Sequence, residues 1–216
     1  RSFYVLDDYS PLRLIGEQAL GKDALLFPVK KALMYVPQQP IGSSGKGMYG
    51  ETFFTAPNPP FGAVFTYYLK EALKTAAEAR RDREKEQDKG GKAVVFPGWD
   101  ALRSEDGEER PEIIVTVTDE AGQVVRRITG PVTEGLHRTS WDLRYPPVDP
   151  PQIEAPARDE WDGSPQGPLV VPGRFTVSLA RRVAGVVSPL GEPQAFAVES
   201  LGLASLGEKD RQALLA

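Results

Sequence analysis

The clearest pattern in the chain is a succession of short, β-branched apolar runs separated by turn residues. Residues 112–118 and 123–128 are two such runs, and the Asp-Glu-Ala-Gly sequence at 119–122 predicts a tight turn between them. Two more strands are predicted at 135–143 and 172–179. A meander of this kind buries one face of each strand and exposes the other, which predicts an antiparallel β-sandwich.

Weaker strand patterns lie on either side of this meander. Residues 24–29 and 32–36 are apolar runs broken or followed by proline, which confines them to sheet edges or connectors because proline cannot donate to a ladder. Residues 61–69 alternate aromatic and small side chains and predict a strand. We expect residues 183–187 and 194–198 to form a last hairpin.

The composition changes after the strand that ends near Leu69. Residues 70–89 are rich in Ala, Glu, Lys and Arg, which predicts one inserted, charged helix over 69–89. A solvated helical arm explains this stretch better than a partner-binding surface, because charged helices of this kind carry little apolar stripe. Residues 91–110 are expected to loop back to the sandwich, and residues 201–216 to begin a short C-terminal helix.

Composition and charge narrow the function classes. The chain has 216 residues, a formal net charge of −4 and no Cys, so it has no global basic field for nucleic acid and no disulfides or thiolate metal ligands. No apolar run approaches the roughly 18 residues that a membrane-spanning helix needs. Because the chain opens on Arg1 and the strand-like run 3–6, we expect it to be a fragment of a longer protein.

The residue types typical of catalytic sites are sparse. The only His, His137, lies inside a strand pattern with no nucleophile-elbow sequence, so a structural role is expected. The Gly/Ser-rich stretch 42–47 resembles a phosphate-binding loop but lacks its first Gly and its final Ser or Thr. Trp99 and Trp141 are interpreted as core or loop-anchoring aromatics. We expect no catalytic residue, no metal site and no cofactor.

Acidic residues are the remaining candidates for chemistry. Asp7-Asp8, Asp119-Glu120 and the acidic cluster in the long loop 146–172 have residue types that pair as glycosidase carboxylates, but such pairs form in space and not in sequence. Turn geometry accounts for Asp119. The loop cluster is a candidate contact for carbohydrate or calcium, although its oxygen spacing is not that of a calcium-binding loop. Its residues are Asp159, Glu160, Trp161 and Asp162.

Three blocks of sequence carry a family resemblance. The Ala-Pro-Asn-Pro-Pro-Phe-Gly-Ala-Val-Phe-Thr-Tyr-Tyr-Leu block at 56–69, the Asp-x-x-Gly turn and the Trp-Asp-Leu-Arg-Tyr strand at 141–145 resemble the region after the propeller in large bacterial BNR-repeat, sortilin-like proteins often labelled glycosyl hydrolase. The opening residues 3–13 resemble the end of a last propeller blade. Residues 114–179 are also similar to the Ig-like domain of flagellar hook-capping proteins.

The resemblance implies an appended domain, and any active site would lie on the missing propeller. We therefore expect residues 1–14 to be the remnant of the last blade and its exit linker, 15–200 an Ig-like sandwich with the helical insertion, and 201–216 the start of a helical extension. The expected function is a non-catalytic accessory or interaction domain that braces the propeller and contacts a protein or carbohydrate partner. The alternative is a glycoside hydrolase using carboxylates of the 146–172 loop. The resemblance also implies a secreted or periplasmic location.

The predicted fold is thus an all-β, Ig-like antiparallel β-sandwich with one inserted charged helix and a short C-terminal helix. Its core should come from apolar and aromatic residues on the inner faces of the strands. These are Phe61, Val64, Tyr67, Ile114, Val117, Val125, Ile128, Trp141, Leu143, Phe175, Val177 and Leu179.

Overall fold

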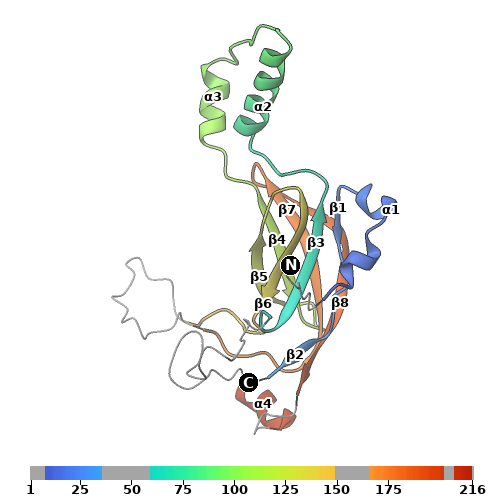
Figure 1. The fold of residues 1–216 in the computed structure, drawn as a ribbon. Helices are drawn as coiled ribbons and strands as arrows, with labels where there is room; N and C mark the ends of the chain where they lie inside the picture. The colour runs from blue at the N-terminus through green and yellow to red at the C-terminus, as the bar shows by residue number, and fades with distance from the viewer. Residues whose placement is uncertain (1–7, 36–58, 149–165, 202–206, 216) are drawn as a thin grey trace, which may run out of the picture.

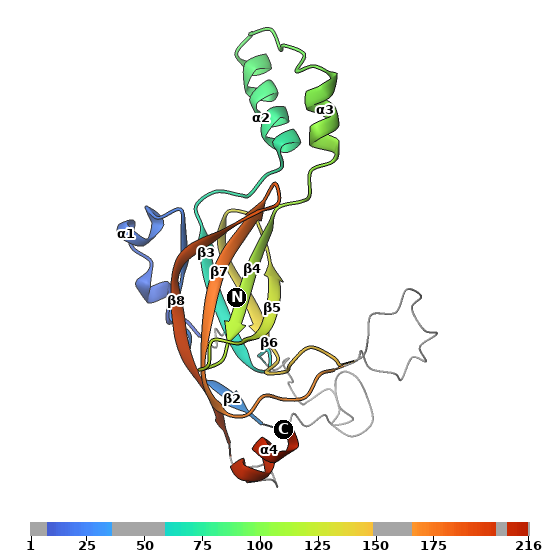
Figure 2. The same ribbon diagram turned by 180° about the vertical axis from the view of Figure 1, so that it is seen from behind.

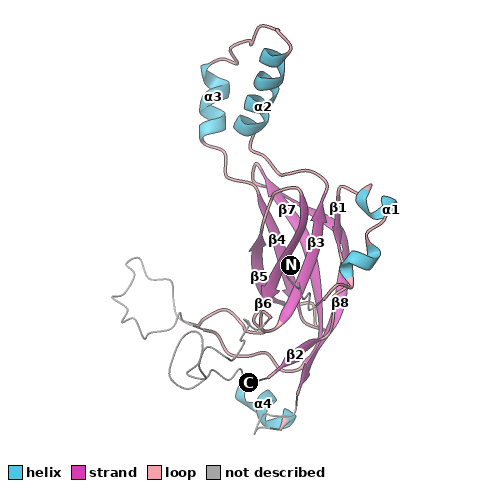
Figure 3. Ribbon diagram, in the orientation of Figure 1, coloured by secondary structure: helices cyan, strands magenta, loops and turns pink. Residues whose placement is uncertain are grey.

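Two facing β-sheets form the body of the protein (Figure 1). The computed structural model describes residues 8–35, 59–148, 166–201 and 207–215, and within them it contains eight strands and a few short helices (Figure 3). In chain order the elements are η1 (Pro11–Leu14), α1 (Glu17–Leu20), β1 (Ala24–Leu26), β2 (Ala32–Met34), β3 (Ala63–Leu69), α2 (Ala76–Lys89), α3 (Trp99–Asp106), β4 (Glu112–Thr118), β5 (Val124–Gly130), β6 (Gly135–Trp141), β7 (Gly173–Val183), β8 (Val186–Ser200) and α4 (Glu208–Leu215).

The strands divide into a three-stranded and a five-stranded sheet. The three-stranded sheet has the order β1-β3-β6, and the five-stranded sheet has the order β2-β8-β7-β4-β5. All pairs are antiparallel except β2 with β8. At the two edges of the body, β1 lies beside β8 and β5 lies beside β6 (Figure 1). The β-rich fold predicted from the sequence is therefore present.

Side chains alternate between the two faces of each strand, and this alternation decides which of them reach the core. In β4, Ile113 and Val117 are completely buried and Ile114 is only half-buried, because successive side chains of a strand point to opposite faces. The prediction that Ile114 and Val117 share the core was wrong for this reason. Val64 was misplaced in the same way, since its neighbour Phe65 is the buried residue of β3.

Most of the other predicted core positions are buried. Phe61 and Ile128 are partly buried and pack against the edge of the core cluster. The predicted residues that are fully inside are Tyr67, Val117, Val125, Trp141, Leu143, Phe175, Val177 and Leu179.

Four aromatic side chains join the two sheets at the centre of the body. Trp141 of β6 meets Phe175 of β7 edge to face with ring centroids 5.3 Å apart, and it meets Phe196 of β8 at 6.4 Å. Phe65 of β3 contacts Phe196 at 5.5 Å. The indole Nε1 of Trp141 donates to the Arg144 carbonyl oxygen at 2.9 Å, so the buried polar group is satisfied.

The helices differ from the sequence prediction in their bounds and number. The strand β3 continues to Leu69, and α2 begins only at Ala76, so residues 69–75 are not helical. Thr75 caps α2 through a reciprocal capping box with Glu78. Residues 91–110, expected as a loop, contain α3. The predicted C-terminal helix is present as α4.

The last hairpin also differs. Residues 183–187 were expected to be a strand, but they hold the end of β7, a tight turn with positive φ at Ala184 and Gly185, and the start of β8. The hairpin is therefore formed by β7 and β8, which are longer than any other strand of the described residues.

We expect Trp141→Ala to lower the free energy of unfolding by about 3–5 kcal/mol, because a fully buried aromatic that touches both sheets leaves a cavity behind. Chemical denaturation measures this change. The matched control is Trp99→Ala, whose side chain is 71% exposed and whose loss should cost less than about 0.5 kcal/mol. Equal losses in the two variants would contradict the assignment of the core.

Candidate functional site

The candidate site lies at the end of the body where the two sheets have unequal lengths. The three-stranded sheet stops at this end with Leu69 paired to Ala24. The β7–β8 hairpin continues to the pair Val183 and Val186. Because the opposite sheet does not reach this far, the inner face of the hairpin is left open to solvent.

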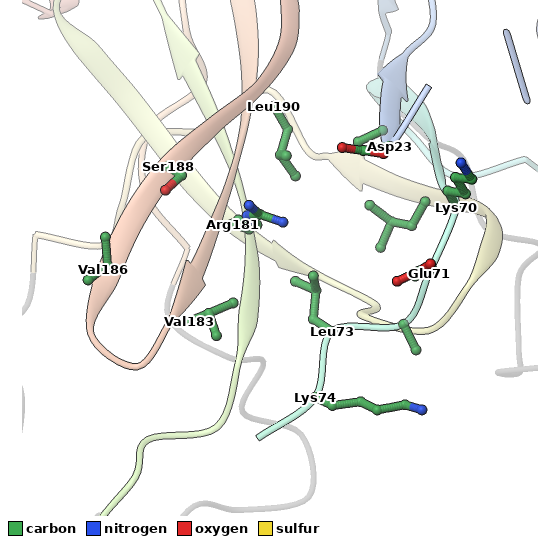
Figure 4. Close-up of a pocket in the computed structure, with 13 residues that line it drawn as sticks. Asp23, Lys70, Glu71, Leu73, Lys74, Arg181, Val183, Val186, Ser188 and Leu190 are labelled. Atoms are coloured by element: carbon green, nitrogen blue, oxygen red, sulfur yellow. The ribbon is translucent and has the colours of Figure 1, made fainter. Parts of the chain in front are cut away.

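A pocket of about 520 Å³ occupies this open end (Figure 4). Apolar walls and charged groups of both signs line it together, a combination that binding surfaces use. The apolar walls come from Leu69, Leu73, Val183, Val186 and Leu190. The charged groups are Asp23, Lys70, Glu71, Lys74 and Arg181.

Arg181 is the polar group best placed to bind something in this pocket. It follows Val177 and Leu179 on the inward-facing register of β7, so its side chain continues the line of core residues beyond the covered part of the sheet. Figure 4 shows it extending across the opening toward the side on which Asp23 and Glu71 lie. Among the described residues it makes no ion pair, which leaves its guanidinium free for a carboxylate or carbonyl group.

A helical arm stands next to the open end. The helices α2 and α3 pack side by side and project away from the sheets (Figure 1, Figure 2). Neither helix has a buried residue. We call residues 76–106 the arm. Because it has no apolar core of its own, polar contacts must hold its two helices together.

The main contact inside the arm is an ion pair between its helices. Arg80 of α2 donates through Nε to Glu105 Oε1 at 2.9 Å and through a terminal nitrogen to Glu105 Oε2 at 2.8 Å, and it also binds Glu84 at 2.7 Å. The hydrogen bond from Arg80 lowers the pKa of the Glu105 carboxyl and raises the pKa of the arginine. At the base of the arm, the Ala76 backbone N–H donates to Glu108 Oε2 at 2.6 Å.

His137 has contacts of a structural kind. Its Nε2 lies 2.6 Å from the Thr133 carbonyl oxygen, and its ring packs on Tyr67 with centroids 5.3 Å apart. The Tyr67 hydroxyl donates to the Pro131 carbonyl oxygen at 2.6 Å, and burial raises the pKa of this phenol. These contacts fix the connection from β5 to β6, and no Ser, Asp or Glu side chain is hydrogen-bonded to the imidazole within the described residues.

The acidic candidates that the structure describes are not brought together. Asp8 accepts from the Ser10 N–H at 3.0 Å and lies 3.4 Å from Lys30 Nζ. Asp119 accepts from the Gln123 N–H at 2.8 Å and closes the predicted turn. No group of three His, Asp or Glu residues that could hold a metal occurs in the described part of the chain. Outside the described residues lie Asp7, Asp159, Glu160, Trp161, Asp162 and the segment 42–47.

Two surfaces were missed in the sequence. The open-end pocket follows from strand lengths, which the local pattern does not encode. The other is the far end of the arm, where Trp99, the first residue of α3, is exposed rather than part of the core. A signal for it existed, since 93–96 is an apolar run between two charged stretches in a region with no strand partner.

Comparisons with family models, with curated proteins and with solved structures found no match. No helix of the described residues is long and apolar enough to cross a membrane.

The ion pair of the arm gives a prediction on pH. Because Arg80 lowers the pKa of Glu105, the pair stabilises the arm fully above pH 4.5, the ordinary pKa of a Glu side chain. This contribution is lost as the pH falls through the lower pKa of Glu105 in the folded protein. We expect the hydrogen-exchange protection of α3 amides, relative to intrinsic exchange, to fall several-fold over that range.

Two variants make this prediction specific. In Glu105→Gln the protection should be low already at neutral pH and should show no step. Asp100→Asn is the matched control, since Asp100 is fully exposed and lies 3.5 Å from Arg103 in the same helix. A step that persists in Glu105→Gln would mean that another group controls the arm.

Proposed function

We propose that this chain is a non-catalytic accessory or interaction domain of a larger secreted or periplasmic protein of the BNR-repeat, sortilin-like propeller type. In this proposal it braces the propeller and binds a protein or carbohydrate partner. In this proposal residues 1–14 are the remnant of the last propeller blade and its exit linker, 15–200 are the Ig-like sandwich with its helical insertion, and 201–216 begin a C-terminal helical extension. The sequence blocks at 56–69 and 141–145 support this relationship.

The proposed fold type is an Ig-like sandwich. The strand order supports it, because β1, β3 and β6 oppose a sheet in which β8, β7, β4 and β5 follow one another, the arrangement of strands A, B and E against G, F, C and C′. The parallel pairing of β2 with β8 corresponds to a first strand that crosses to the second sheet. The arm then occupies the connection between β3 and β4, which correspond to strands B and C.

The observation that carries the bracing function is the open end of the body. An apolar wall with Leu73, Val183 and Leu190 is only partly buried, next to a free arginine, Arg181, at the rim. Uncovered apolar surface with a few placed polar groups is what a docking surface needs. We propose that the propeller covers this end, with a carboxylate or carbonyl group bound to Arg181.

A test uses the isolated propeller of the longer polypeptide and this chain in a binding titration. Val186→Lys places a charge on the inner face of the hairpin end, where an unpaired buried charge should weaken binding at least about tenfold, or 1.4 kcal/mol. Val187→Lys is the matched control, because Val187 is similarly exposed, at 58% against 65%, and does not line the pocket. Its binding should equal that of the unmodified chain.

Equal binding by both variants would show that the open end is not part of the interface, and no binding by the unmodified chain would contradict the bracing function.

The alternative function, glycoside hydrolysis, predicts a different result. The chain would then hydrolyse aryl glycosides, and Glu160→Gln or Asp162→Asn would abolish this activity. Turnover by the purified chain that is lost in those variants would replace the accessory function.

A further inference from the structure

The loop at the far end of the arm carries a cluster of exposed apolar side chains. We call residues 89–99, which run from the last residue of α2 to the first residue of α3, the apex (Figure 1, Figure 2). Within it Val95 is 80% exposed, Trp99 71%, Phe96 58% and Val94 47%. Single exposed apolar residues are ordinary, but four large ones within six positions form a patch that calls for an explanation.

The stability of the folded arm does not explain why these exposed side chains are apolar. The arm has no buried residue, and its helices are held by Arg80 and Glu105, far along the arm from the apex. The one ring contact at the apex is between Phe96 and Trp99, which meet edge to face at 5.3 Å. Polar residues at these positions would leave every other contact of the arm intact, so the apolar character of the apex points to something outside the chain.

The charged residues within the apex are lysines, and an aspartate, Asp88 or Asp100, flanks it on each side. From Lys89 to Trp99 the sequence has two lysines and no acidic residue. Lys89 pairs with Glu86 at 2.8 Å, whereas Lys92 makes no ion pair with any described residue. Aromatic side chains next to lysines are typical of segments that lie at a membrane–water interface, where the rings enter the interfacial region and the ammonium groups meet anionic headgroups.

The shape of the apex favours a lipid surface over a folded partner. A standard protein interface takes about 800 Å² and 20–30 residues from each side, and it needs a complementary surface. The apex is a convex end of eleven residues. A bilayer is deformable and receives a small convex insertion without a preformed pocket. The 14 residues of α2 also hold the apex about 21 Å from the base of the arm, so the sheets would not obstruct it.

We propose that the apex inserts Val94, Val95, Phe96 and Trp99 into the interfacial region of a lipid membrane, with Lys92 on an anionic headgroup. The arm then anchors the body at a fixed distance from the surface. This inference concerns a different surface from the bracing function and does not depend on it.

The test is binding of the purified 216-residue chain to vesicles. We expect it to co-sediment with vesicles of phosphatidylcholine and phosphatidylglycerol and to bind phosphatidylcholine vesicles more weakly. In a Trp161→Phe background, Trp99 emission should shift to the blue on binding and be quenched by brominated lipid, since the other remaining tryptophan, Trp141, is already buried.

Variants locate the contact. The double variant Phe96→Ser, Trp99→Ser should bind at least tenfold more weakly, with unchanged melting temperature because both side chains are exposed. The matched control is Val124→Ser, Val187→Ser, which changes two exposed apolar residues on the strands and outside the open-end pocket, and should bind normally. Lys92→Glu should weaken binding to the anionic vesicles by more than about fivefold, because one lysine near such a surface contributes about that factor to the affinity.

Absence of vesicle binding by the unmodified chain would overturn the proposal, as would normal binding by the double variant. If the chain ignores vesicles but a photo-crosslinker at position 95 captures a protein, the apex is a protein contact and the lipid assignment is wrong.

Discussion

The packing of Trp141 against Phe175 and Phe196 is the contact on which the rest of the body depends. These rings come from strands of both sheets, so their burial holds the two layers together, and edge-to-face pairs contribute about 0.5–1.5 kcal/mol each beyond the area that they bury. The polar groups around them are satisfied within the same region. The indole donates to Arg144, and the Tyr67 hydroxyl donates to Pro131, so closure of the core leaves neither donor without a partner.

The arm is held together by a different kind of interaction from the body. It has no buried residue, and its helices are joined by the partly buried ion pair of Arg80 and Glu105, whose side chains are 19% and 12% exposed, so that water and salt still reach and weaken it. The body can therefore remain folded while the arm opens. This division suits the two proposals, since the open end belongs to the rigid body and the apex belongs to a projecting element that tolerates change without loss of the core.

Local patterns predicted what depends on local sequence. The strand β4 has the predicted bounds because its β-branched residues run without interruption between Pro111 and the turn at Asp119. The start of α2 was missed because composition changes at Lys70, whereas the helix needs the cap at Thr75. The open-end pocket depends on how far β7 extends beyond β3, which is a tertiary property that periodicity does not carry. The apolar run 93–96 was a local signal for the apex, but its exposure depends on which segment the rest of the fold leaves uncovered.

Native-state hydrogen exchange in low denaturant tests this account most directly, because it measures the opening of each amide separately. We predict that amides of β3, β6, β7 and β8 exchange with one common free energy equal to that of global unfolding. Amides of α2 and α3 should exchange through a local opening of much lower free energy that hardly depends on denaturant. If the arm amides instead follow the sheet amides at the same free energy, the arm is part of the cooperative core and the account is wrong.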